Sequence, residues 1–328
     1  MAMRSSPDPP TLSRAQGCLL GQFAGDALGG LVEFQSPQEI WRKHPNRVRD
    51  LSDGGTWGTL AGQPTDDSEM ALMLARMLVR LRRYDSEQAR KAYLFWYNSA
   101  PFDCGGTVSR GLSGTPDTDS QANGALMRIS PLAIFGANYD LVQVSAWAQQ
   151  DASLTHPHPV CLQANALFAM AIADAIGTGK GAQDLYRQIE TWAAEMKVEA
   201  ALMKTITAAS IAAPPDYIRQ QGWVLIAFQN ALWQLLHAPS LEEGVVDTVM
   251  RGGDTDTNAA IAGALLGAVY GREAVPAQWV EKLLTCRPEA GNPRVRHPRP
   301  ECFWPVDALD IAMNLVAGGA NDSDPPST

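Results

Sequence analysis

The sequence predicts an all-α, compact single-domain helical fold. Ala, Leu, Met, Gln and Arg, which are good helix formers, dominate the interior of the chain. Alternating patterns typical of β-strands are nearly absent. Apolar residues make up 45% of the 328 residues and charged residues 19%, which excludes an intrinsically disordered chain. Helices this numerous must bury their apolar faces on one another, so we expect one helical domain.

The domain is expected to span residues 13–318. Residues 1–12 are rich in Ser, Pro and Asp and predict a flexible arm, and residues 319–328 predict a disordered tail. The start has no apolar segment of the kind that a signal peptide needs. The purest apolar runs, such as 259–270, are shorter than the ~20 residues of a membrane-spanning helix. Five scattered cysteines without a C-x-x-C pair fit a reducing compartment, so we expect a cytoplasmic protein without a membrane span.

Helix-length apolar patterns mark the individual elements. Their spacing follows the period of an amphipathic helix over 10 to 20 residues. The clearest segments, in chain order, are 70–83, 160–176, 182–196, 223–236, 258–270 and 307–316.

Glycine recurs at every fourth position in two segments. Each glycine inside a helix costs about 1 kcal/mol relative to alanine, so a stripe of them indicates that another backbone approaches closely. We therefore expect both stripes to mark tightly packed core helices. The first stripe is Gly17, Gly21, Gly25 and Gly29, and the second is Gly263, Gly267 and Gly271.

The charge pattern argues against nucleic acid as a partner. The formal net charge is −9, and the basic clusters, such as 80–83, are short. Binding to a phosphate backbone needs an extended basic surface. An acidic surface by itself is typical of a soluble protein.

The first acidic cluster, Thr65-Asp66-Asp67-Ser68-Glu69, opens a predicted helix. Thr65 or Asp66 can cap this helix, and Asp66 with Glu69 resembles a capping box. Acidic residues also suit a helix N-terminus electrostatically. Taken alone, the cluster is as expected for a helix cap.

The second cluster follows two glycines and opens the helix predicted from residue 258. Asp256 or Thr257 can cap it, but the preceding Gly252-Gly253 pair also permits a sharp turn beside a ligand. Together the paired aspartates of the two clusters offer four carboxylates, each pair with a threonine hydroxyl beside it, an oxygen-only set that suits Mg²⁺ or Mn²⁺. Capping and a dinuclear metal site are both open at this point.

Five strings together give a family resemblance. They resemble the ADP-ribosylglycohydrolase family, and the match runs over about residues 17–316. The paired TDD and GGDTDT elements in this order, with the first glycine-rich helix, are highly specific. The strings are GCLLGQFAGDALGGLVEF (17–34), TDDSEMAL (65–72), NGALMRISPLAI (123–134), LTHPHP (154–159) and GGDTDTNAAIAGALLGA (252–268).

The resemblance implies an all-α fold with two Mg²⁺ or Mn²⁺ ions that hold the ribose hydroxyls of an ADP-ribosyl group. By motif matching, the metal ligands would be Thr65, Asp66, Asp67, Asp254, Asp256 and Thr257.

The resemblance also implies catalytic roles for Glu33 and Asp103. Glu33 matches a glutamate near the metals, although an exposed carboxylate at a helix end is the simpler interpretation of the residue alone. Asp103 matches an aspartate of the arginine-specific branch, and a turn aspartate is its alternative. Which of the two acts as acid and which as base stays open.

Three further residues match the substrate cleft of the family. Asn123-Gly124 resembles a loop that wraps the diphosphate, and backbone N–H groups of such loops can bind phosphate. Ala122 stands where a further glycine is common in the family. His156 matches a cleft histidine, but a histidine before a proline is more often a turn residue.

The implied activity is hydrolysis of the N-glycosidic bond that joins ADP-ribose to an arginine of an ADP-ribosylated protein, with ADP-ribose as product. Relatives also cleave serine and other linkages. Two alternatives are an immunity protein against an ADP-ribosylating toxin, in which residues 1–12 would block the toxin, and a non-catalytic ADP-ribose-binding protein. The intact set of metal-site aspartates argues against the last.

Overall fold

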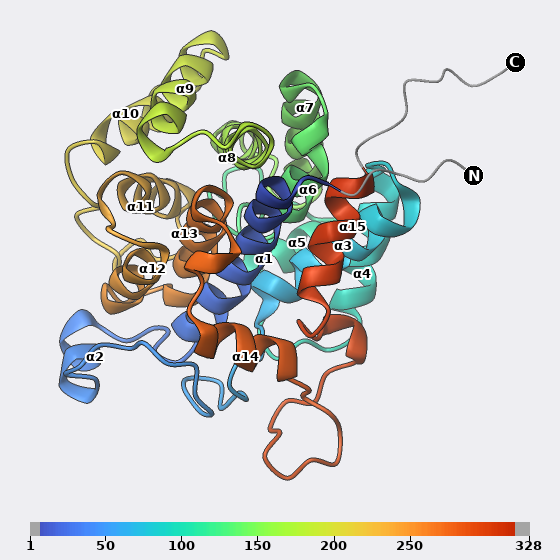
Figure 1. The fold of residues 1–328 in the computed structure, drawn as a ribbon, viewed down its shortest axis with the longest axis vertical. Helices are drawn as coiled ribbons and strands as arrows, with labels where there is room; N and C mark the ends of the chain where they lie inside the picture. The colour runs from blue at the N-terminus through green and yellow to red at the C-terminus, as the bar shows by residue number, and fades with distance from the viewer. Residues whose placement is uncertain (1–6, 319–328) are drawn as a thin grey trace, which may run out of the picture.

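A bundle of helices surrounds a central pair, as the computed structural model of residues 7–318 shows (Figure 1). Within this range there is no β-strand, so the all-α prediction is confirmed. Three short 3₁₀ helices, η1 (Gly136–Asn138), η2 (Arg272–Ala274) and η3 (Glu301–Phe303), join longer elements. The α-helices are α1 (Pro9–Gly29), α2 (Pro37–Lys43), α3 (Asp66–Leu81), α4 (Ser86–Tyr97), α5 (Gly106–Leu112), α6 (Ser130–Phe135), α7 (Leu141–Ser153), α8 (Pro159–Thr178), α9 (Ala182–Glu195), α10 (Ala200–Ala209), α11 (Val224–His237), α12 (Leu241–Met250), α13 (Thr255–Tyr270), α14 (Ala277–Thr285) and α15 (Ala308–Gly318).

The two glycine stripes pack on each other and form the centre of the fold. A Cβ atom at Gly21 would lie 2.2 Å from the carbonyl oxygen of Gly263, and one at Gly17 would lie 2.5 Å from that of Gly267. Helices α1 and α13 therefore touch backbone to backbone, and the predicted close approach is confirmed. Gly271 has φ +80° and ends α13 instead of lying within it.

The remaining helices are arranged around this central pair. Helices α8, α11 and α12 pack against α13, α15 packs against α1, and α3 contacts both. Figure 1 shows α9 and α10 on the outside of the first group. Because α1 and α13 run antiparallel, the C-terminal end of α1 meets the N-terminal end of α13: a Cβ at Gly29 would lie 2.4 Å from the Cα of Asp256. This contact brings two distant parts of the chain together.

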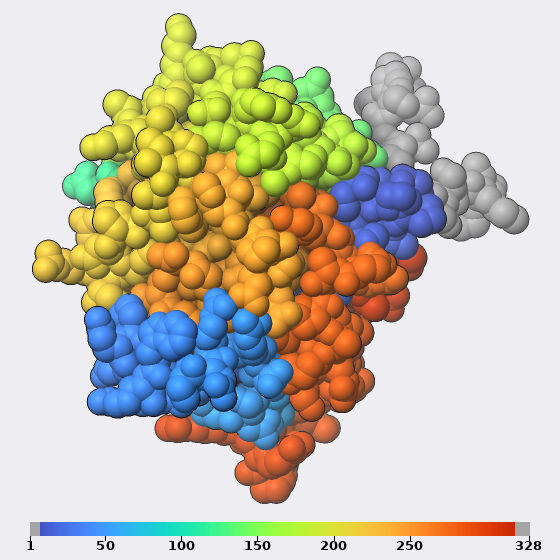
Figure 2. Space-filling model, turned by 60° about the vertical axis from the view of Figure 1, so that its left-hand side comes forward, coloured from blue at the N-terminus to red at the C-terminus, as the bar shows by residue number. Residues whose placement is uncertain are grey.

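The segment around α2 lies on the surface against α12. Figure 2 shows it in blue beside the orange part of the chain. Arg47 forms an ion pair of 2.6 Å with Glu243, and Arg49 pairs with both Glu242 and Glu243 at 2.8 and 2.6 Å.

The N-terminal boundary of the domain differs from the prediction. Helix α1 begins at Pro9, so residues 9–12 are helical and not part of a flexible arm. Asp8 caps the helix by accepting a hydrogen bond from the N–H of Thr11 at 3.2 Å, and prolines at the first positions suit a helix start. Residues 1–6 and the predicted tail 319–328 lie outside the described residues.

One helix is longer and more apolar than the sequence analysis allowed. Helix α8 spans 20 residues and could cross a membrane by length and composition, although no apolar segment long enough was expected. In the fold, 83% of its most apolar window is buried. It packs on α6, α7 and α13, as the core helix of a helical domain does.

Candidate metal and catalytic site

A cavity of about 280 Å³ opens where the N-terminal ends of α3 and α13 meet the end of α1. Its lining comes from the first turns of α3, α5 and α13, from the segment that follows α1 and from loops elsewhere in the chain. Asp67 and Thr65 lie next to it, fully buried in the wall. The predicted residues that line it are Glu33, Asp66, Asp103, Asn123, Gly124, His156, Asp254, Asp256 and Thr257.

The first acidic cluster does more than cap α3. Thr65 occupies the N-cap position, but its hydroxyl lies 2.9 Å from Asp26 Oδ1 and 2.9 Å from Asp67 Oδ2. Asp66 Oδ2 accepts a hydrogen bond of 3.2 Å from the N–H of Gly105. Asp67 Oδ1 is buried without a hydrogen-bond partner among residues 7–318. A buried carboxylate oxygen in this state needs an external partner.

The second cluster is aimed at the same space. Asp254 lies at the N-cap position of α13, and its Oδ2 accepts a hydrogen bond of 2.7 Å from Asn123 Nδ2. The preceding Gly253 has φ +77°, and a Cβ there would lie 2.1 Å from a carbonyl oxygen of Tyr217. Gly253 also exchanges two backbone hydrogen bonds, of 2.8 and 3.0 Å, with residues 34 and 35. The glycine thus fixes the start of α13 beside the Glu33 segment.

Three carboxylates from three segments converge at the cavity. One carboxylate oxygen from each of Glu33, Asp103 and Asp256 lies within 4.8 Å of the other two. Glu33 is 5% exposed, and its Oε2 accepts a hydrogen bond of 2.6 Å from Trp57 Nε1. It is therefore a buried site residue and not an exposed carboxylate at a helix end.

The electrostatics of the cluster are unfavourable without a cation. Burial, reinforced by the charge of Asp103, raises the pKa of Glu33 to about 8, and burial raises the pKa of Asp103 to about 6. Burial likewise raises the pKa values of Asp66, Asp67, Asp254 and Asp256. Among residues 7–318, no Lys or Arg forms an ion pair with any of these six carboxylates.

The donor set fits a divalent cation. It consists of carboxylate and hydroxyl oxygens, one of which is buried and unpartnered, and it carries uncompensated negative charge. Hard oxygen ligands of this kind are those that Mg²⁺ and Mn²⁺ prefer.

The predicted substrate-binding residues Asn123, Gly124 and His156 line the same cavity, and Asn123 contacts the acidic cluster through Asp254. His156 is fully buried, so it is not a surface turn residue. Its Nδ1 lies 2.8 Å from the hydroxyl of Thr155, and its Nε2 has no partner among the described residues. Burial, together with the charge of Arg128, lowers its pKa to about 3, so the ring is neutral. A Cβ at Gly124 would lie 2.9 Å from Val108 and 3.1 Å from His156, so glycine keeps this wall open.

Sequence reasoning missed Asp26. It is buried on α1, and it accepts hydrogen bonds from the N–H and hydroxyl of Thr65 at 3.1 and 2.9 Å and from the N–H of Ser68 at 3.1 Å. Asp26 therefore fixes the first turn of α3. An acidic residue within an otherwise apolar, glycine-rich helix was the available signal.

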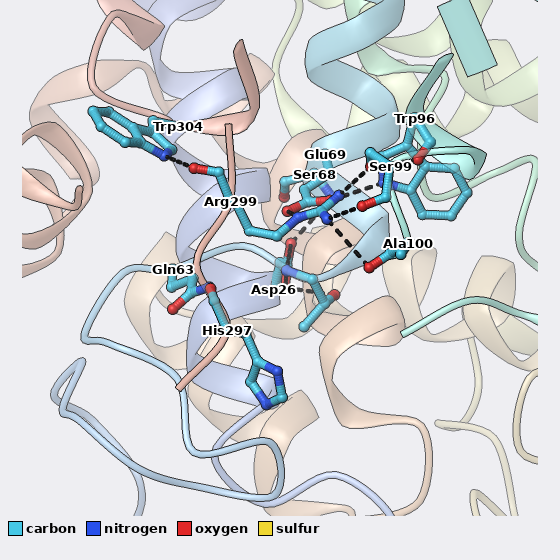
Figure 3. A network of polar contacts seen from close by, with 11 residues as sticks. Asp26, Gln63, Ser68, Glu69, Trp96, Ser99, Ala100, His297, Arg299 and Trp304 are labelled. Atoms are coloured by element: carbon cyan, nitrogen blue, oxygen red, sulfur yellow. Dashed lines mark hydrogen bonds and ion pairs between the residues drawn. The ribbon is translucent and has the colours of Figure 1, made fainter. Parts of the chain in front are cut away.

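Sequence reasoning also missed Arg299, which lies at the centre of a polar network (Figure 3). Its Nε and Nη2 donate to the two oxygens of Glu69 at 2.8 and 2.7 Å, and Trp96 Nε1 donates to Glu69 Oε2 at 2.8 Å. Nη1 donates to the carbonyl oxygens of Ser99 and Ala100 at 3.0 and 3.4 Å. Arg299 thus ties the first turn of α3 to the loop after α4, which leads into the cavity.

The sequence model of the ADP-ribosylglycohydrolase family matches residues 7–297. The ADP-ribosyl-[dinitrogen reductase] glycohydrolase of Rhodospirillum rubrum is 30% identical over 286 residues, which cover 84% of this chain and 92% of the relative. The ADP-ribosylarginine hydrolase Tri1 of Pseudomonas putida (strain GB-1) is 29% identical over 291 residues, covering 83% and 74%.

Two further matches are more distant in sequence. The ADP-ribosylhydrolase ARH3 of Homo sapiens is 25% identical over 325 residues, which cover 82% of this chain and 88% of the relative. A solved structure described as an ADP-ribosylglycohydrolase-related protein complex superposes with a TM-score of 0.77 at 26% identity, covering 94% of this chain and 99% of that one.

Proposed function

The chain belongs to the ADP-ribosylglycohydrolase family, a family of hydrolases that act on ADP-ribosylated substrates, and we propose that it removes ADP-ribose from arginine side chains of proteins in a reaction that depends on Mg²⁺ or Mn²⁺. The observation that carries the proposal is the convergence of Glu33, Asp103 and Asp256 beside the unpaired carboxylates of α3. The names of two relatives, the R. rubrum glycohydrolase and the arginine hydrolase Tri1, support removal of ADP-ribose as the reaction.

The two acidic clusters form the floor on which the ribose would bind. When bound, divalent ions supply an electrophilic centre that orients and polarises neighbouring sugar oxygens. The residues that would hold such ions each offer a carboxylate or hydroxyl oxygen at the floor of the cavity. They are Thr65, Asp66, Asp67, Asp254, Asp256 and Thr257.

Glu33 and Asp103 are the proposed proton-transfer residues. In the reaction, the oxygen of a water molecule forms a bond to C1″ of the ribose, and the bond from C1″ to the guanidinium nitrogen breaks. One carboxyl group of the pair accepts the proton from the water, and the other donates a proton to the departing nitrogen.

Asn123, Gly124 and His156 would bind the rest of the ADP-ribosyl group. Asn123 Nδ2 donates a hydrogen bond to Asp254, so Asn123 also orients the carboxylate of Asp254 at the floor of the cavity. The open wall at Gly124 permits close approach of a diphosphate to the backbone. The unpartnered Nε2 of the neutral His156 is free to meet a polar substrate atom.

Arginine is the proposed linkage because Asp103 matches the arginine-specific branch and Tri1 is named for arginine. ARH3 is less similar in sequence, at 25% identity. The choice of arginine over other linkages therefore needs its own test.

The test measures release of ADP-ribose from an arginine-ADP-ribosylated protein with Mg²⁺, with Mn²⁺ and with EDTA, beside the same assay on a serine-ADP-ribosylated peptide. We expect release from arginine that EDTA abolishes and that either metal restores. Release from serine alone would overturn the linkage. No release from either substrate, with tight binding of ADP-ribose, would overturn the hydrolase in favour of a binding protein.

A further inference from the structure

Three aromatic side chains form a row beside the two proton-transfer carboxylates. The ring of Trp57 lies 6.5 Å from that of Phe34, edge to face, and 5.9 Å from that of Phe102. Phe34 and Phe102 are the direct sequence neighbours of Glu33 and Asp103. We call Phe34, Trp57 and Phe102 the aromatic row.

Polar contacts hold Trp57, the middle of the aromatic row, and ring stacking holds Phe102. Trp57 Nε1 donates to Glu33 Oε2 at 2.6 Å, and the carbonyl oxygen of Trp57 lies 2.8 Å from Nε2 of His297. The His297 ring stacks on Phe102 with 4.6 Å between centroids. The row is therefore a fixed surface.

Phe34 has an exposed side chain and a strained backbone conformation, and packing of its side chain explains neither. It is 56% exposed, yet it lines the cavity. Its φ is +65°, a left-handed conformation that is costly for a residue with a bulky side chain. Its N–H donates to the carbonyl oxygen of Gly253 at 2.8 Å, which holds this conformation. Strain of this kind is typical of functional positions.

Phe34 is the member of the row that lines the cavity, and it lies where the group that leaves the ribose would lie. If the ribose binds on the acidic floor and Glu33 and Asp103 flank the bond that breaks, the departing group is next to the neighbours of these carboxylates. This step rests on the proposed function. Among the described residues, arginine guanidinium groups lie over the rings of Tyr93, Tyr217 and Phe303, and over no ring of the row.

We propose that the aromatic row is the subsite for the guanidinium group of the ADP-ribosylated arginine and that it selects this group over an uncharged hydroxyl leaving group. A guanidinium is a planar cation that stacks on aromatic faces, and the neighbouring carboxylates add attraction of the correct sign. A serine side chain is neither planar nor charged and gains neither contribution. The row therefore contributes to linkage specificity.

The test replaces Phe34 by leucine, which keeps apolar area and removes the aromatic face. We expect Phe34→Leu to lower kcat/KM for the arginine-linked substrate about 3- to 30-fold, the range of a cation–π contact. The Kd for ADP-ribose should stay within twofold of the wild type, and Phe34→Tyr should restore the kcat/KM. Phe102→Leu is a second variant of the same row, with an effect of the same direction.

A matched control is Phe95→Leu. Phe95 lies on α4, is 58% exposed and contacts Phe303, so it has the exposure of Phe34 outside the row. It should leave kcat/KM unchanged.

A second measurement uses inhibition of the wild type by arginine amide and by its uncharged isostere citrulline amide. We expect arginine amide to inhibit more strongly, and Phe34→Leu to weaken only that inhibition. Equal inhibition by both amides would overturn the proposal.

The outcomes separate this proposal from the proposed function. If the wild type does not release ADP-ribose from arginine, the function fails. If the wild type does so and Phe34→Leu retains the wild-type kcat/KM, the aromatic row is not the subsite. If Phe34→Leu weakens ADP-ribose binding as strongly as it lowers kcat/KM, Phe34 acts on ADP-ribose and the proposal is overturned.

Discussion

The first turn of α3 carries buried carboxylates of two kinds only a few residues apart. Glu69 receives two hydrogen bonds from the Arg299 guanidinium and one from the Trp96 indole. Asp66 and Asp67 are equally buried but have no cationic partner among residues 7–318. The same contrast recurs between Asp151, which is paired with buried Arg128, and the acidic residues of the cavity.

The difference separates stabilising charges from functional ones. Burying an uncompensated carboxylate costs several kcal/mol, so a fold keeps such groups together only where an external cation or substrate compensates them. The Glu69–Arg299 pair is complete within the protein. The cavity carboxylates have no compensating positive charge among the described residues, and this lack indicates that they bind a ligand.

The largest expected effect comes from neutralising one of the cavity carboxylates. Asp103→Asn should lower kcat for arginine-linked substrate by about 10²–10⁴-fold, the usual contribution of a general acid or base. Thermal unfolding without metal should show no loss of stability, because the change removes a buried charge of raised pKa. Wild-type turnover in Asp103→Asn would contradict the catalytic role.

A change in the Glu69–Arg299 pair should lower stability, whereas Asp103→Asn should lower kcat without loss of stability. Arg299→Met leaves Glu69 buried without its cation and should lower the free energy of unfolding by about 3–5 kcal/mol. Denaturant titration measures this.

Arg76→Met is the matched control for the pair. Arg76, which lies on α3 like Glu69, pairs with Asp307 before α15 through two contacts of 2.7 and 2.9 Å, but the two side chains are 29% and 38% exposed. A loss of about 1 kcal/mol or less is expected there. Equal losses in the two variants would show that burial does not set the difference.

A smaller effect concerns His156, which is buried next to a cation instead of an acid. Its pKa is about 3 in the folded state and near 6.5 when exposed, so below pH 6 the unfolded chain binds a proton that the folded protein does not. As the pH falls from roughly 6 to 4, this difference lowers the free energy of unfolding of the wild type by about 1.4 kcal/mol per pH unit. His156→Asn should lack this slope, measured as the difference between the two proteins. Parallel pH profiles would argue against a buried neutral histidine.

The local features of the fold were predictable from the sequence. The glycine stripes predicted that α1 and α13 are tightly packed core helices, because a repeated small residue indicates close packing, but the sequence did not show that the two helices contact each other. The acidic clusters predicted the floor of the cavity, since each cluster lies within a few residues at one helix start. Only their convergence needed the fold or the resemblance.

The long-range features were not predictable. Arg299 lies 230 residues from Glu69, and no local pattern links them. The aromatic row joins residues from three loops, and Asp26 meets Thr65 across 39 positions. Helix α1 also starts earlier than expected because Asp8 and two prolines form a helix start within a segment whose composition resembles a flexible arm.

The central claim is that the uncompensated carboxylates bind a divalent cation. Calorimetric titration of Mn²⁺ and of Mg²⁺ into EDTA-treated protein tests it most directly, with Asp67→Asn as the variant and Asp307→Asn, which removes an acid outside the cavity, as control. We predict saturable binding in the wild type and the control, weakened about tenfold or more in Asp67→Asn. At 100 times the Kd, the cation should also stabilise the wild type by about 2.7 kcal/mol. Absence of binding at millimolar metal, or equal binding by Asp67→Asn, would contradict the account.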